Sequence, residues 1–305
     1  MLQSTSKIWK IRELMKQAIE YMQKKGFPEP RLNVELLLAY ALQCQRIELY
    51  TNFDKPLAKH ELARFRALVE RRLAYEPVQY IIGSTNFMGL QFAVDRRVLI
   101  PRPETETLVE QVMIRCNALN EDKVISILEV GAGSGNIAVA LAKFVKNCVV
   151  TSIDISTQAL EVARQNAVSH GVEERVFFQH MDAFEPVDQL LLRRFDFLVS
   201  NPPYVSINEW EVLRPEVREF EPREATSDGA DGYELFRRLI EIAPFVLNEG
   251  GKALFEVGDD MAFTVLSMMH EEGFFDLSAV RDLQGIERVV VGSCHTRVRN
   301  PISIN

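Results

Sequence analysis

The sequence of 305 residues has no apolar run that approaches the roughly 18 residues of a membrane-spanning helix. The first 25 residues lack the apolar core and the small-residue cleavage site of a secretion signal. Their apolar residues recur at helical spacing, which is typical of an amphipathic helix in the folded protein. We therefore expect a protein of the cytoplasm that does not bind membranes.

Cysteine and histidine are also scarce. No two of the four cysteines lie at metal-binding spacing, and the five histidines form no HExxH-like pair. The sequence thus predicts no metal site and indicates free thiols in a reducing compartment. The cysteines are Cys44, Cys116, Cys148 and Cys294.

Basic residues are unevenly distributed. Residues 1–80 hold 14 Lys/Arg and 9 Asp/Glu, a net charge of +5, whereas the remainder holds 21 and 34, a net charge of −13. An enzyme that acts on nucleic acid usually has a basic surface around its active site. The acidic remainder therefore disfavours stable binding to nucleic acid, although the charges could simply be solvated faces.

The chain changes character twice along its length. Residues 1–80 place apolar residues at helical spacing, as in VELLLAYAL (34–42), and predict a small helical domain of four or five helices. Residues 81–103 contain two β-rich runs, around Gly83 and Gly89, which predict a β-hairpin that links two domains. From 104 to 294 strand-like and helix-like segments alternate, and the tail 295–305 follows no pattern that we can interpret.

The alternating region predicts an α/β fold with a doubly wound, mostly parallel sheet of the Rossmann-like kind. An antiparallel pair is expected at the end of this sheet. The predicted buried strands are 124–130, 148–154, 175–180, 195–200 and 252–258, and the final pair lies within 275–283 and 287–293.

A glycine-rich turn follows the first predicted strand. In ILEVGAGSGNIAVALA, Gly131, Gly133 and Gly135 permit positive φ and close approach of a ligand to backbone N–H groups. Asn136 stands where a dinucleotide fingerprint requires glycine, Glu129 precedes the turn, and no Gly-Lys-Ser/Thr pair is present. The turn is therefore unsuited to a pyrophosphate. The alternative is a turn that only packs a helix on a strand.

Two carboxylates lie at the ends of the next two strands. Asp154 could accept both hydroxyl groups of a ribose, and Asp182 could accept from an adenine amino group. Parallel strands open their carboxyl ends into one crevice. A nucleoside with a zwitterionic arm, such as S-adenosylmethionine, suits these three strand ends. The pattern resembles the class I methyltransferases over residues 104–293.

The fourth strand ends in SNPPY (200–204). Pro202 and Pro203 cannot extend a sheet. The Asn201 side-chain oxygen and the Pro202 carbonyl could instead accept both hydrogens of a planar nitrogen, and Tyr204 could wall that planar group. The alternative is a rigid surface turn that merely ends a strand.

The turn resembles the [D/N]PP[Y/F] motif of methyltransferases that act on planar nitrogens. LIPRPETE (99–106), the helical domain, the hairpin and DLQGIERVVVG (282–292) are all similar to the HemK family of protein glutamine methyltransferases. This resemblance covers essentially the whole chain. It implies methylation of the glutamine in the GGQ loop of class 1 peptide chain release factors by a monomer. Alternatives are a methyltransferase of a ribosomal protein glutamine or of nucleic acid, and a non-catalytic binding module.

The resemblance also implies the role of individual residues. Those that would bind the cofactor are Glu129, Gly131, Ala132, Gly133, Ser134, Gly135, Asp154, Ile155, Asp182, Ala183, Phe184 and Asn201. Those that would bind the glutamine are Asn201, Pro202, Pro203 and Tyr204, of which Asn201, Pro202 and Tyr204 are the predicted catalytic residues. The family often has an aromatic residue in place of Ala183, a function that Phe184 could take over. Arg102 and Glu104 either contact the substrate or form a structural ion pair.

Overall fold

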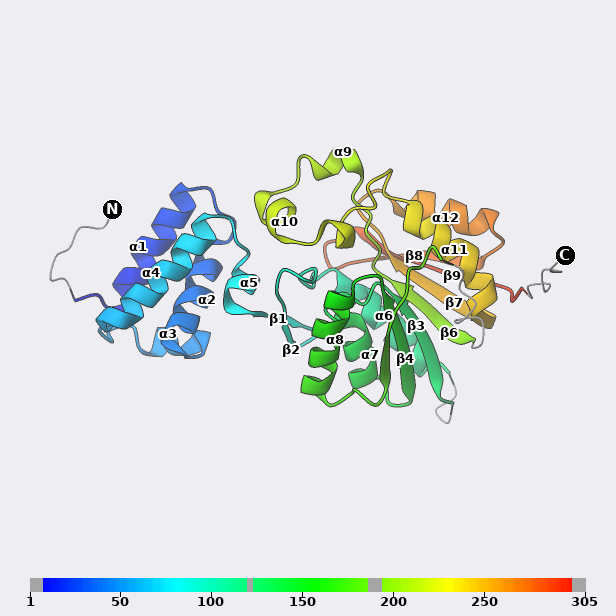
Figure 1. Cartoon of the computed structure of the whole chain (residues 1–305), viewed down its shortest axis with the longest axis horizontal. Coiled ribbons are helices and arrows are strands. Elements are labelled where there is room, and N and C mark those ends of the chain that lie inside the picture. Colours follow the sequence, from blue (N-terminus) through cyan, green and yellow to red (C-terminus); the bar gives the residue numbers. More distant parts are fainter. Residues whose placement is uncertain (1–7, 120–122, 186–193, 298–305) are drawn as a thin grey trace. The chain divides into compact units, whose positions relative to one another are not determined.

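A computed structural model of the protein describes residues 8–119, 123–185 and 194–297 (Figure 1). The chain divides into two compact units. The helical unit comprises residues up to Gly83 together with Pro215–Phe220, and the sheet unit comprises Ser84–Arg214 and the residues from Glu221 onward. The chain therefore passes from the sheet unit to the helical unit and back, late in the sequence.

The helical unit consists of short helices around one apolar core. In the first of them the buried residues Ile11, Leu14, Met15 and Met22 recur at helical spacing, so that one face turns inward. The helices are α1 (Ile11–Lys24), α2 (Pro30–Leu42), α3 (Arg46–Thr51), α4 (Lys59–Leu73), α5 (Val78–Ile82) and, from the distant segment, α10 (Pro215–Phe220).

A buried arginine ties α10 to the rest of the helical unit. Arg72 of α4 is only 4% exposed, and its guanidinium pairs with Glu216 of α10 at 2.8 Å. The same group donates to Asn33 Oδ1 at 2.7 Å and lies over the Phe27 ring. Because a buried charge is costly unless it is paired, α10 is an integral part of this unit.

The sheet unit contains a seven-stranded sheet in the order β5-β4-β3-β6-β7-β9-β8. The first five strands in this order run parallel, and β9 is antiparallel to both of its neighbours. This confirms the predicted doubly wound, mostly parallel sheet and its antiparallel end. The strands are β3 (Ile125–Val130), β4 (Cys148–Asp154), β5 (Val176–His180), β6 (Phe195–Ser200), β7 (Leu247–Glu256), β8 (Phe275–Arg281) and β9 (Glu287–Ser293).

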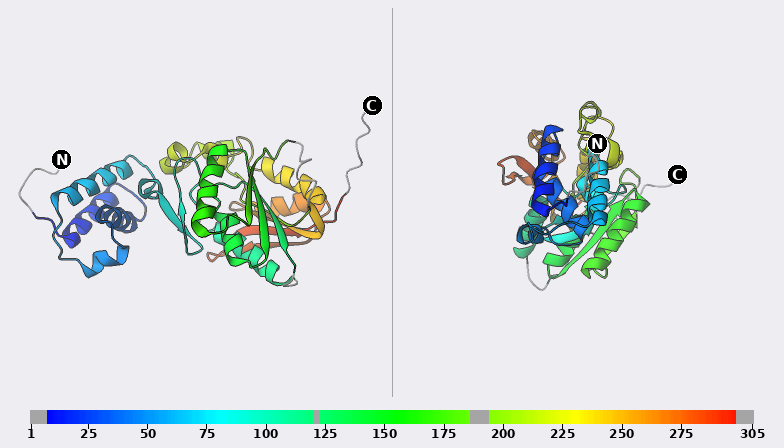
Figure 2. Two further views of the ribbon diagram at one scale, coloured as in Figure 1. Left: turned by 60° about the horizontal axis from the view of Figure 1, so that its bottom comes forward. Right: turned by 90° about the vertical axis from the view of Figure 1, so that its left-hand side faces the viewer.

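Helices cover both faces of this sheet (Figures 1 and 2). Successive residues of β3 contact opposite faces, since Ile127 packs into one apolar core and Leu128 into the other. A parallel strand buried on both faces is an almost continuous apolar run, which explains why these strands could be predicted. The helices are α6 (Thr105–Asn117), α7 (Asn136–Phe144), α8 (Thr157–His170), α11 (Glu234–Val246) and α12 (Ala262–Glu271). Between β6 and α11 lie α9 (Ile207–Trp210) and the 3₁₀ turn η2 (Arg223–Ala225).

The β-hairpin of β1 (Ser84–Phe87) and β2 (Leu90–Ala93) belongs to the sheet unit. Phe87 and Phe92 meet edge to face and join the core beneath α6 and α7. The Asn166 side chain of α8 fixes β2, because it accepts from the Ala93 N–H at 2.8 Å and donates to the Ala93 carbonyl at 3.0 Å. Within the described residues, no helix has the length and apolarity required to cross a membrane.

Candidate active site

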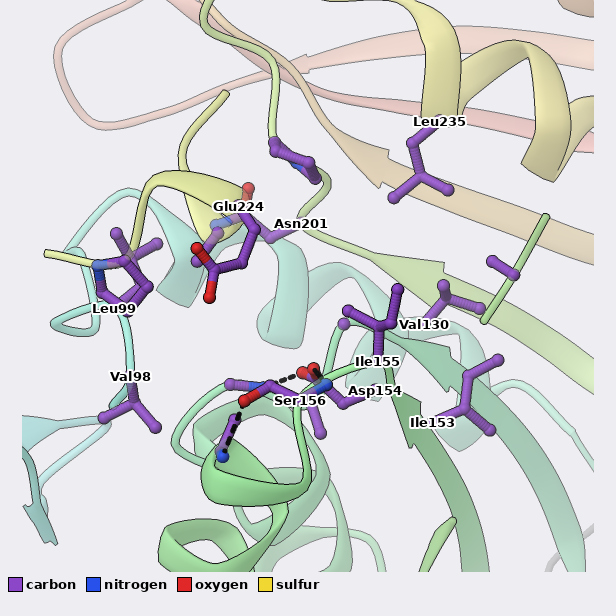
Figure 3. Close-up of a pocket in the computed structure, with 18 of the residues that line it drawn as sticks. Val98, Leu99, Val130, Ile153, Asp154, Ile155, Ser156, Asn201, Glu224 and Leu235 are labelled. Atoms are coloured by element: carbon purple, nitrogen blue, oxygen red, sulfur yellow. Dashed lines mark hydrogen bonds between the residues drawn. The ribbon is translucent and has the colours of Figure 1, made fainter. Parts of the chain in front are cut away.

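The sheet places a cavity where its strand order reverses. From β3 the chain goes to β4 on one side, and β6 lies on the other, so the carboxyl ends of these strands open into a crevice. A cavity of about 390 Å³ lies there (Figure 3). Its lining includes the glycine turn after β3, the ends of β4 and β5, the turn after β6, the segment before α6 and residues around η2.

The glycine turn is held against the end of β4. The backbone N–H groups of Gly131 and Ala132 both donate to the Ile153 carbonyl, at 2.9 and 3.1 Å. Gly131 has φ 89°, a conformation that residues with a side chain rarely adopt. The turn thus presents backbone rather than side chain to the cavity, as the sequence predicted for a ligand that approaches closely.

Gly135 directly precedes α7 and serves packing instead. Its φ is 80°, and a Cβ built on it would lie 3.1 Å from Cα of Ala163 on α8. Gly135 does not line the cavity, whereas Gly131, Ala132, Gly133 and Ser134 do. The packing role considered for this turn therefore applies to its last glycine.

Asp154, at the end of β4, lines the cavity (Figure 3). Its Oδ2 accepts from the Gly133 N–H at 2.9 Å, and its Oδ1 accepts from the Ser156 N–H at 2.8 Å. Burial raises the pKa of this carboxyl group, while those backbone bonds lower it. Each carboxylate oxygen can accept more than one hydrogen bond, so Asp154 remains able to bind two hydroxyl groups of a ligand. Ile155, which follows it, is 56% exposed and lines the cavity.

Glu129 lies beneath the glycine turn and outside the cavity lining. The side chain is fully buried, and the Ser152 hydroxyl donates to its Oε2. Its Oε1 has no hydrogen-bond partner among the described residues. Burial raises the pKa of Glu129 to about 8. A buried oxygen without a donor is costly, and a cationic amino group of a ligand would remove that cost.

The end of β5 supplies one edge of the cavity. Asp182 accepts from the Phe184 N–H at 2.9 Å through Oδ1, and Ala183 is buried. Phe184 is 55% exposed and lines the cavity. The structure therefore offers an aromatic ring at the position next to Ala183, where the sequence indicated a substitute.

The NPPY turn presents two of its four residues to the cavity. Asn201 and Pro203 line it, whereas Pro202 is buried beside them. The Asn201 Nδ2 donates to Oγ1 of Thr105, at the start of α6, at 3.2 Å. Its other amide atom, Oδ1, is thereby directed away from Thr105.

Tyr204 lies outside this cavity. Its ring packs against Gly258, where a Cβ would lie 3.1 Å from the Tyr204 Cδ2 atom. Tyr204 lines a second cavity of about 580 Å³, together with Gly258 and Arg288. Burial raises the pKa of its hydroxyl group above the usual range. The structure thus does not bring Tyr204 into the cavity whose wall it was predicted to form.

Several residues of the cavity were missed in the sequence. Glu224 of η2, labelled in Figure 3, lines the cavity, and Asp228 and Glu234 add two more carboxylates to the lining. The signal was the segment EPREATSDGADGYE (221–234), which is rich in acidic and turn residues and follows NPPY. These side chains make the cavity suitable for a ligand with positive charge.

Arg102 anchors this acidic segment. It pairs with Glu221 at 2.7 Å, and Glu221, which is 6% exposed, also accepts from the Ile100 N–H at 3.3 Å. The structural ion pair considered for Arg102 is therefore formed with Glu221 and not with Glu104 in the described part of the chain. It joins the segment before α6 to the segment before η2, and both of these line the cavity.

The described residues contain no group of three or more His, Cys, Asp or Glu side chains that could hold a metal ion. The four cysteines form no disulfide bond. The site combines a doubly wound sheet with a glycine turn after one strand, a carboxylate at the end of the next strand and a proline-rich turn at the end of β6. This combination defines a Rossmann-like methyltransferase, and residues 110–213 match the family model "Methyltransferase small domain".

Known proteins narrow the class to one family. Residues 13–83 match the "PrmC N-terminal domain" model. The chain is 43% identical to the release factor glutamine methyltransferase of Geobacter sulfurreducens, over 93% of this chain and 97% of that protein. The corresponding proteins of Chlorobaculum tepidum and Rhodopirellula baltica are 43% and 38% identical, over 92% of this chain and 96% and 95% of their lengths. The chain belongs to the release factor glutamine methyltransferase family, as its motifs predicted, and is an enzyme of that family.

Proposed function

We propose that this enzyme transfers a methyl group from S-adenosylmethionine to the side-chain amide nitrogen of the glutamine in the GGQ motif of class 1 release factors. One observation carries the proposal. Asn201, at the end of β6, lines the same cavity as Asp154 and the glycine turn, so an acceptor for the substrate amide lies beside the cofactor groups. The relatives of this chain are named release factor glutamine methyltransferases, which supports a release factor glutamine as the substrate.

The residues present fit the cofactor. Glu129 has an unpartnered buried oxygen that suits the amino group of the methionine part. Asp154 suits the ribose, and Asp182, Ala183 and Phe184 suit the adenine. The carboxylates of Glu224, Asp228 and Glu234 complement a positive charge. When bound, the cofactor supplies a methyl group that is already activated by its sulfonium.

The chain's own residues then have to prepare a poor nucleophile. The lone pair of an amide nitrogen is delocalised into its carbonyl group. Acceptors that hold both N–H hydrogens, namely Asn201 Oδ1 and the Pro202 carbonyl, favour a geometry in which the nitrogen can accept the methyl group. The nitrogen gains a bond to the methyl carbon as the bond of that carbon to the sulfonium sulfur breaks, with the electron pair left on sulfur, and the nitrogen afterwards loses one proton to water. No titrating base among the side chains is required for this step.

Selection of the protein substrate falls to groups remote from the reacting nitrogen, because glutamine alone offers little to recognise. Residues 1–80 carry a net charge of +5 in an otherwise acidic chain, which favours the helical unit as the docking surface. We expect the enzyme to act as a monomer in the cytoplasm. The acidic sheet unit argues against a nucleic acid as the substrate.

Labelling tests the proposal directly. The enzyme is incubated with tritiated S-adenosylmethionine and, separately, with a class 1 release factor, the same factor with GGQ changed to GGA, ribosomal proteins, and DNA or RNA. We expect label on the intact release factor and none on the GGA variant. Label on a ribosomal protein or on nucleic acid, with none on the release factor, would assign the enzyme to that other substrate.

A further inference from the structure

The side chain of Asn201 contacts a buried hydroxyl group. Thr105, the first residue of α6, is 1% exposed, and its oxygen accepts a hydrogen bond from the Asn201 Nδ2 at 3.2 Å. A threonine hydroxyl also carries one hydrogen, which needs an acceptor when it is buried. The acceptor of this hydrogen therefore determines the orientation of the side-chain amide of Asn201.

Glu256 is in position to receive it. In the pairing of β6 with β7, Ser200 lies opposite Phe255, so Asn201 and Glu256 follow at neighbouring strand ends. Glu256 is 1% exposed, and its Oε2 has no hydrogen-bond partner among the described residues. The Thr105 hydroxyl is the nearest candidate donor, since an interaction with Thr105 is among the causes that lower the pKa of this carboxyl group.

The two ends of an asparagine amide are almost equal in size, so hydrogen bonds decide their orientation. An ionised carboxylate only accepts, so the Thr105 hydrogen points to Glu256 and the Thr105 oxygen can only accept from Asn201. The NH₂ group of Asn201 therefore faces Thr105, and its Oδ1 faces the cavity. In the reverse orientation the NH₂ group would oppose the N–H groups of the substrate amide.

We propose that Thr105 and Glu256 are positioning residues for methyl transfer, in a chain of hydrogen bonds from Asn201 to Thr105 to Glu256 that directs the Asn201 oxygen to the substrate nitrogen. The inference rests on the proposed function, because it takes Asn201 as the acceptor for that nitrogen. It also gives a reason for the presence of a buried carboxylate, which otherwise only costs stability.

The rate of turnover should therefore depend on whether Glu256 is ionised. Burial raises its pKa to about 7. The charged groups that face it are Arg288, Arg102 and Glu104, of which the arginines lower its pKa and Glu104 raises it, and the Tyr204 hydroxyl is a further neighbour. Once protonated, Glu256 becomes a donor, and Thr105 is then free to donate to the Asn201 oxygen. Turnover should consequently fall as the pH decreases through the pKa of Glu256.

A matched pair of variants tests the chain. Thr105→Val keeps the shape of the side chain and removes the hydroxyl group, whereas Thr105→Ser retains it. We expect Thr105→Val to lower kcat on the order of tenfold, the usual effect of one hydrogen bond, and Thr105→Ser to stay near the wild-type rate. Cofactor affinity by calorimetry should change little in both. Equal kcat for Val, Ser and wild type would overturn the proposal, as would parallel losses of cofactor affinity and melting temperature in Thr105→Val.

The second variant, Glu256→Gln, cannot take up a proton. We expect its kcat to be several-fold lower than that of the wild type at pH 8 and to vary little between pH 6 and pH 8, while the wild-type rate falls towards pH 6. The same fall in both enzymes would exclude Glu256 as its cause.

The kcat of each variant relative to the wild type can be measured with whichever substrate the enzyme methylates. If the wild type labels another substrate, the proposed function fails, and the variants are compared on the substrate that is labelled.

A measurement without turnover completes the test. The side-chain NH₂ resonances of Asn201, identified by their loss in Asn201→Ala, should shift in Thr105→Val and should titrate with pH in the wild type but not in Glu256→Gln. Unchanged resonances would refute the chain of hydrogen bonds.

Discussion

Replacement of Asp154 by alanine should weaken the binding of S-adenosylmethionine and leave the fold intact. The proposed bonds from two ribose hydroxyl groups to this carboxylate are lost, each worth roughly 1.5–3 kcal/mol because the acceptor is charged. The sum is about 3–6 kcal/mol, or roughly a 10²–10⁴-fold rise in the dissociation constant. Turnover at saturating cofactor should fall much less.

The structure indicates why the glycine turn should survive this change. Asp154→Ala removes the acceptor for the N–H groups of Gly133 and Ser156, but the glycine turn keeps the bonds of Gly131 and Ala132 to the Ile153 carbonyl. Isothermal titration calorimetry gives the affinity, and thermal unfolding without cofactor checks the fold. Asp182→Ala is the matched control, with a smaller loss expected. An unchanged dissociation constant for Asp154→Ala would remove this residue from the ribose site.

Three further predictions concern the substrate turn, the helical unit and pH. Asn201→Ala should lower kcat ~10²–10³-fold at near-normal cofactor affinity by calorimetry; lost binding with intact turnover would reverse its role. Arg72→Ala should destabilise the helical unit by about 3–5 kcal/mol in urea, since Glu216 loses its partner; unchanged unfolding would contradict this. In the folded protein the pKa of Glu256 is raised to about 7, above its value in the unfolded chain. Its ionisation therefore lowers the free energy of unfolding as the pH rises from the unfolded pKa to about 7. The melting-temperature gain of Glu256→Gln should therefore be larger at pH 8 than at pH 5.

Some parts of the fold and site were predictable because local sequence determines them. The central strands are continuous apolar runs, and Asp154 is recognisable because it ends such a run directly after the glycine turn. The start of β7 was not predictable. It begins at Leu247, where LNEGG has low strand propensity, because Leu247 pairs with Phe195 of β6. Pairing between distant segments thus overrides local preference.

Long-range contacts account for the rest of what was missed. Nothing local to Arg102 indicates that its partner is Glu221, more than a hundred residues away, rather than the nearby Glu104. Nothing in NPPY indicates to which side the Tyr204 ring turns, since Gly258 provides the space for it. Glu256 is an acidic residue in an apolar strand, and the acceptor role that we propose for it exists only in the folded state.

The discontinuous helical unit has a consequence for how the protein is made. A ribosome synthesises α1 to α5 first, yet Arg72 has no partner until Glu216 has emerged from the exit tunnel. Until then the guanidinium group of Arg72, which is buried in the finished core, must stay hydrated. The helical unit therefore cannot complete its folding while only α1 to α5 have left the ribosome. The same dependence limits gene fusions. A chimera that exchanges residues 1–83 between two relatives separates Arg72 from its native α10, unless residues 215–220 are exchanged with it.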